Sequence, residues 1–69
     1  MTHVEVVLKD GKGSRFSVEA DPVAVAQATL ADLRGPHPFI AWATTIGTMF
    51  FVAKDQIAVI VVNVPEQPS

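Results

Sequence analysis

The side chains of this chain that could do chemistry are few, and they stand apart. His3 and His37 lie far from each other and lack the His-x-x-His or His-x-x-x-His spacing of a zinc site. No serine or threonine has the Gly-x-Ser-x-Gly setting of an activated nucleophile. Asp21 precedes a proline, as a helix-capping aspartate does. We therefore expect a non-enzymatic protein that holds no metal and no cofactor.

Positive charge gathers around one glycine-bearing loop. Lys9, Lys12 and Arg15 alternate with Gly11 and Gly13, whose backbone amides could approach a phosphate. The Walker pattern Gly-x-x-x-x-Gly-Lys-Ser/Thr is absent, so we interpret the loop as a solvated hairpin turn. The alternative is a ring in which copies of the three cations form a rim that binds single-stranded RNA or DNA. The net charge of −2 disfavours this alternative, because affinity for nucleic acid comes largely from phosphate neutralisation.

The composition predicts a small domain that needs help to cover its apolar surface. With 69 residues the chain forms one domain, expected over residues 1–64, with a flexible tail at 65–69. Of all residues 49% are hydrophobic and only 17% are charged, which excludes intrinsic disorder. The chain contains no cysteine, so disulfides cannot stabilise it. Oligomerisation is the remaining means, and we expect the main partner to be a second copy.

The first half of the chain predicts a hairpin followed by a helix. Apolar and polar residues alternate over 4–8 and again over 15–20, which is typical of half-buried strands joined by the glycine-bearing turn. Asp21 and Pro22 predict a helix start, and Gly35 predicts its end in a left-handed conformation. The residues expected on the buried face of this helix of about three turns are Val23, Ala26, Leu30 and Leu33.

The second half is apolar on both faces of every strand that it could form. Segments 39–45, 48–53 and 57–64 are separated by short turns and predict a three-stranded antiparallel meander. The fold class is therefore α+β in the order ββαβββ, a small and strongly bent antiparallel sheet or partial barrel with one helix packed on it. One helix cannot cover both faces of the sheet. The residues expected at a subunit interface are Trp42, Met49, Phe51, Ile60 and Val62.

A long uncharged stretch raises the question of a membrane. No residue from Gly35 to Ala53 is charged, and a spanning helix needs about 20 mainly apolar residues. Pro36, Pro38 and Gly47 interrupt the stretch, and its β-branched and aromatic residues are typical of strands. We expect no membrane span. The start of the chain lacks a basic segment followed by an apolar run, so we expect a cytoplasmic location.

Two segments resemble the Sm-like proteins, a family of small barrels of the SH3-like kind. Residues 50–60 are similar to the second Sm-like signature, an apolar strand, a short polar turn and an apolar strand that ends in isoleucine. Val6 to Gly11 is similar to the opening strands. The resemblance implies a strongly bent five-stranded sheet and a ring formed by pairing the last two strands of neighbouring subunits. Ala53 and Lys54 replace the Arg-Gly of the Sm-like turn, and the acidic and asparagine residues of the first signature are absent, so RNA contacts are not carried over.

These patterns together predict a homo-oligomer with a structural or adaptor role in protein–protein binding. The first alternative is the Sm-like ring with a basic rim described above. The second is a module that holds a small apolar ligand between sheet and helix, in a pocket lined by Trp42 and Leu30.

Overall fold

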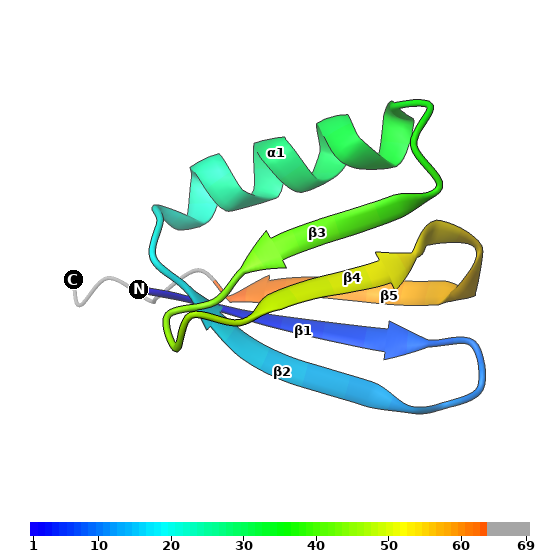
Figure 1. Ribbon diagram of the computed structural model, residues 1–69, viewed down its shortest axis with the longest axis horizontal. Coiled ribbons are helices and arrows are strands. Elements are labelled where there is room, and N and C mark those ends of the chain that lie inside the picture. The colour runs from blue at the N-terminus through cyan, green and yellow to red at the C-terminus, as the bar shows by residue number, and fades with distance from the viewer. Residues whose placement is uncertain (64–69) are drawn as a thin grey trace, which may run out of the picture.

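Five strands and one α-helix make up the part of the chain that the computed structural model describes, residues 1–63. Their order, ββαβββ, confirms the predicted α+β class. The expected boundary at residue 64 and the tail at 65–69 lie outside the described residues. The elements are β1 (Thr2–Leu8), β2 (Gly13–Val18), α1 (Pro22–Arg34), β3 (Phe39–Ala43), β4 (Met49–Ala53), the short 3₁₀ turn η1 (Lys54–Gln56) and β5 (Ile57–Asn63) (Figure 1).

The predicted first hairpin is confirmed. β1 pairs with β2 in antiparallel register, with Val4 opposite Phe16. Gly11 adopts a φ of 91°, which favours glycine, and the backbone amide of Lys12 donates a hydrogen bond of 2.9 Å to Oδ1 of Asp10. The turn residues therefore set the register that places alternate side chains of β1 on one face.

The predicted start of the helix and its predicted end at Gly35 are also confirmed, whereas the predicted left-handed conformation of Gly35 is wrong. The Asp21 side chain accepts hydrogen bonds from the amides of Val23 and Ala24 at 3.1 and 3.3 Å. Gly35 is extended, with φ −77° and ψ 172°, and not left-handed. Its amide donates to the carbonyl of Asp32 at 3.2 Å, so a tight last turn ends the helix and leads the chain straight toward Pro36.

The buried face of α1 differs from the predicted one. Val25 and Thr29 are each 6% exposed, whereas Val23, Leu30 and Leu33 are exposed. Positions 25 and 29 are one turn apart and face the core, where Thr29 accepts a hydrogen bond from the indole of Trp42. A buried tryptophan usually has such an acceptor, and the face of the helix that supplies it is the one without its largest apolar side chains.

The predicted meander is wrong, because β5 leaves β3 and β4. Strands β3 and β4 form a two-stranded sheet, and β5 pairs with the free edge of β1 to give a second sheet in the order β2-β1-β5. Val4 and Val6 of β1 are at most 2% exposed. A strand buried this deeply needs a neighbour on both edges, and β5 supplies Val62 and Ile60 opposite these valines. The η1 turn carries the chain between the two sheets.

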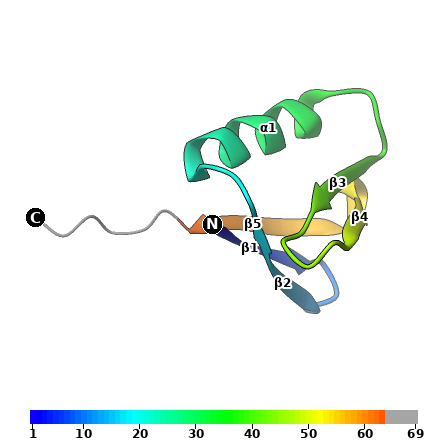
Figure 2. The same ribbon diagram turned by 60° about the vertical axis from the view of Figure 1, so that its left-hand side comes forward.

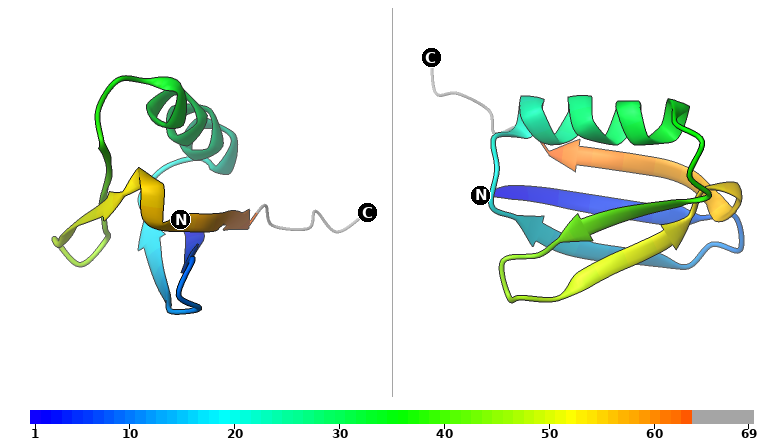
Figure 3. Two further views of the ribbon diagram at one scale, coloured as in Figure 1. Left: turned by 90° about the vertical axis from the view of Figure 1, so that its right-hand side faces the viewer. Right: turned by 45° about the horizontal axis from the view of Figure 1, so that its top comes forward.

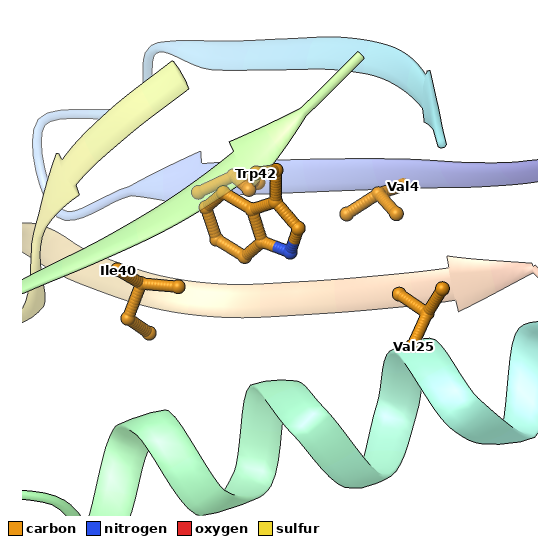
Figure 4. Close-up of a cluster of buried hydrophobic side chains, with 5 residues drawn as sticks. Val4, Val25, Ile40 and Trp42 are labelled. Atoms are coloured by element: carbon orange, nitrogen blue, oxygen red, sulfur yellow. The ribbon is translucent and has the colours of Figure 1, made fainter. Parts of the chain in front are cut away.

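Both α1 and the β3–β4 hairpin cover the same face of the three-stranded sheet (Figure 2). The side chains of Val4, Val25, Ile40 and Trp42 converge between these layers (Figure 4). The two sheets stay separate and do not close into a barrel (Figure 3), so the fold is small and β-rich but not the continuous sheet that the Sm-like resemblance implies. No helix within residues 1–63 has the length and apolar character to cross a membrane.

Candidate functional site

The outer surface of the β3–β4 hairpin is made of apolar side chains alone. Alternate residues of the two strands point inward, and Ile40, Trp42, Phe50 and Val52 pack in or against the core. The other set points away from the core and carries no polar group. We call this set the hairpin face; it consists of Phe39, Ala41, Ala43, Met49, Phe51 and Ala53.

Large and small side chains alternate across the hairpin face. Every cross-strand pair joins one large residue with one alanine, and the pairs are Phe39 with Ala53, Ala41 with Phe51, and Ala43 with Met49. The large side chains are 56% (Phe39), 67% (Phe51) and 52% (Met49) exposed. Three ridges therefore stand beside three hollows, which is the relief that interlocking surfaces need.

The structure separates the five residues predicted at a subunit interface. Met49 and Phe51 lie on the hairpin face and are open to a partner. Trp42 is only 6% exposed, and Ile60 and Val62 are partly buried against the same core. These three pack inside one subunit because they share the face of their strands that meets the helix.

The basic loop presents fewer free cations than its sequence suggests. Lys9 and Lys12 are exposed at the β1–β2 turn. Nε of Arg15 donates a hydrogen bond of 2.8 Å to Oε2 of Glu5, its cross-strand neighbour. This hydrogen bond and the charge of Glu5 raise the pKa of Arg15 above its ordinary value. The guanidinium is therefore already engaged by a carboxylate.

The hairpin register brings His3 and Ser17 together, a pair that sequence reasoning missed. They are cross-strand neighbours, and His3 Nδ1 lies 2.9 Å from Ser17 Oγ on the solvent side of the sheet. Numbering the cross-strand pairs outward from the β1–β2 turn would have predicted that His3 lies opposite Ser17. Among residues 1–63 no carboxylate forms a hydrogen bond with His3, and no cluster of three metal-ligating side chains occurs. A histidine that no third group orients lacks the arrangement of a catalytic triad.

A groove runs between α1 and β3, beside the hairpin face. Its volume is about 500 Å³, and α1 borders it with Ala24, Ala28 and Asp32. The floor is Trp42, whose indole Nε1 lies 3.4 Å from Oγ1 of Thr29. Of the two residues expected to line a ligand pocket between sheet and helix, Trp42 lines this groove and Leu30 does not.

Comparisons of this chain with protein-family models, with curated proteins and with solved structures found no match.

Proposed function

We propose that this chain is a non-enzymatic protein that self-associates through the hairpin face and serves a structural or adaptor role in protein–protein binding. The observation that carries the proposal is the exposure of Phe39, Met49 and Phe51 on a surface without any polar side chain. Contiguous exposed apolar surface of this kind marks an interaction site in a protein that is stable in water.

The size of the core supports the need for a partner. Only five hydrophobic side chains are buried in the described part of the chain. Full burial of a large apolar side chain stabilises a protein by about 1.5–3 kcal/mol. More than half of the surface of Phe39, Met49 and Phe51 is still exposed, so most of this stabilisation is not yet realised for them. Covering the hairpin face would therefore add a large fraction of the total stability of so small a domain.

The relief of the hairpin face supports a second copy as the partner. A two-fold axis through the face can place Phe51 of one subunit over Ala41 or Ala43 of the other. The large side chains of each subunit then fill the hollows at the alanines of the other. Two such faces bury on the order of 1,000 Å², near the lower limit of specific interfaces, so we expect dissociation constants in the micromolar range.

Light scattering over a dilution series tests this proposal. We expect a mass of at least twice 7.4 kDa at high concentration, falling toward 7.4 kDa on dilution. The variant Phe51→Glu should stay monomeric while keeping its circular dichroism spectrum, because a buried unpaired carboxylate is costly.

Val59→Glu is the matched control. Val59 is 49% exposed and lies opposite Val7 on the outer surface of the three-stranded sheet, away from the hairpin face. It should self-associate as the unchanged chain does. A monomer at every concentration would overturn the proposal, as would dissociation by Val59→Glu but not by Phe51→Glu.

A further inference from the structure

The edge of β3 that faces α1 carries unpaired backbone groups. The amide of Thr44 donates to Thr48, and that of Lys54 donates to the carbonyl of Pro38, so even-numbered residues of β3 turn their backbone toward β4. The backbone N–H and C=O groups of Phe39, Ala41 and Ala43 consequently point the other way. Within residues 1–63 no strand pairs with them.

One end of this edge already accepts a neighbour. Just beyond β3, the amide of Thr45 donates a hydrogen bond of 3.0 Å to the carbonyl of Ser17 in β2. After Ser17 and the end of β2, the chain leads away into α1 and leaves the rest of the β3 edge open. The open part matches one short strand in length, because β3 spans five residues.

The lining of the groove along this edge suits an extended chain. Ala24 and Ala28 keep the helix wall low, and Trp42 forms an apolar floor that Thr29 holds in place. The volume of about 500 Å³ lies within the range of pockets that hold small ligands, about 300–1,000 Å³.

The charge of the groove is one-sided. Glu19, which precedes α1, and Asp32, near the C-terminal end of α1, line the groove, and no lysine or arginine does. Neither carboxylate forms an ion pair with a described residue. Residues 64–69 contain Glu66 and no basic residue, so their charge does not complement the groove.

We propose that the groove between α1 and β3 binds an extended segment of another protein, which adds as a strand to the edge of β3. Its backbone pairs with Phe39, Ala41 and Ala43, small apolar side chains meet Trp42, and a lysine or arginine at one or both ends meets Asp32 or Glu19. This site goes beyond self-association, since it uses the β3 edge and the helix, although Ala41 and Ala43 of the hairpin face also line it.

A selection from random displayed heptapeptides against the purified full chain tests the proposal. We expect enriched peptides that contain lysine or arginine and alternate apolar residues. The best of them, made synthetically, should shift the NMR signals of the amides of Phe39, Ala41 and Ala43 and slow their hydrogen exchange. Absence of any enriched peptide, or shifts confined to another surface, would overturn the proposal.

Matched variants give the decisive comparison. Ala28→Arg fills the groove and should weaken binding by about tenfold or more, whereas Ala31→Arg, exposed on the same helix outside the groove, should not change it. Asp32→Lys should weaken binding of lysine-bearing peptides in the same way. A peptide methylated on alternate backbone nitrogens should bind poorly. Equal binding of that peptide would overturn strand addition and indicate a pocket for small apolar groups.

The same titrations in the Phe51→Glu background separate this site from self-association. We expect peptide affinity in the monomeric variant to equal or exceed that of the unchanged chain, because Phe51 does not line the groove, whereas Ala41 and Ala43, which the dimer would cover, do. Loss of peptide binding in that variant would show that the groove is not an independent site.

Discussion

Phe16 and Trp42 face each other with ring centroids 5.3 Å apart and ring planes inclined by 52°. Phe16 belongs to β2, and Trp42 belongs to β3 of the other sheet. Phe16 also stacks on Phe50 of β4, with centroids 4.9 Å apart. One side chain of the three-stranded sheet thus contacts both strands of the hairpin, so it determines how firmly the hairpin face is held on the rest of the domain.

Replacing Phe16 by alanine should lower the free energy of unfolding by about 3 kcal/mol, because it removes two aromatic contacts and leaves a cavity between the sheets. Chemical denaturation at a fixed chain concentration measures the change. Ile46→Ala is the control, since Ile46 is 84% exposed at the hairpin tip, and it should change stability by less than about 0.5 kcal/mol. Equal effects of the two variants would contradict this role of Phe16.

The hydroxyl of Thr29 matters because the indole N–H of Trp42 is buried and needs an acceptor. Thr29→Val keeps the shape of the side chain but removes that acceptor, and should cost about 1–3 kcal/mol of stability. Thr29→Ser keeps the hydroxyl and should cost less. Thermal unfolding of both variants measures the difference, and a valine variant as stable as the unchanged chain would contradict the prediction.

The elements of the fold could be predicted from local sequence, but their pairing could not. The turn at Gly11 and the cap at Asp21 are decided by neighbouring residues, so both predictions are confirmed. The partner of β5 depends on contacts distant in sequence. Because Ile60 and Val61 are both apolar, alternation could not tell which of them faces the core. The pairing of β5 is instead determined by β1, which needs a second neighbouring strand.

The same limit explains the mixed outcome for the candidate site. The sequence predicted an excess of apolar surface, and the structure exposes Met49 and Phe51. The sequence also placed Trp42 at the surface, because every residue of β3 is apolar and no polar residue marks the outer face. Thr29, which accepts a hydrogen bond from the buried indole, lies on a different element and carries no signal in the sequence of β3.

We expect no binding of single-stranded RNA through the basic loop. Arg15 is engaged by Glu5, which leaves Lys9 and Lys12 as the cations available at this loop. Titration of labelled oligouridylate at about 50 mM salt should show no association in the micromolar range. Tight binding that weakens steeply with salt and is lost in Lys12→Glu would contradict this expectation and favour a basic rim.

Nuclear Overhauser effects between differently labelled subunits test the central claim most directly. In an equal mixture of isotope-labelled and unlabelled chains, contacts observed between the two kinds of chain must be intermolecular. The hairpin-face dimer predicts contacts from the ring of Phe51 to the methyl groups of Ala41 or Ala43, since ridges lie over hollows. Intermolecular contacts to Val59 and Val61 in their place, or none at millimolar concentration, would contradict it.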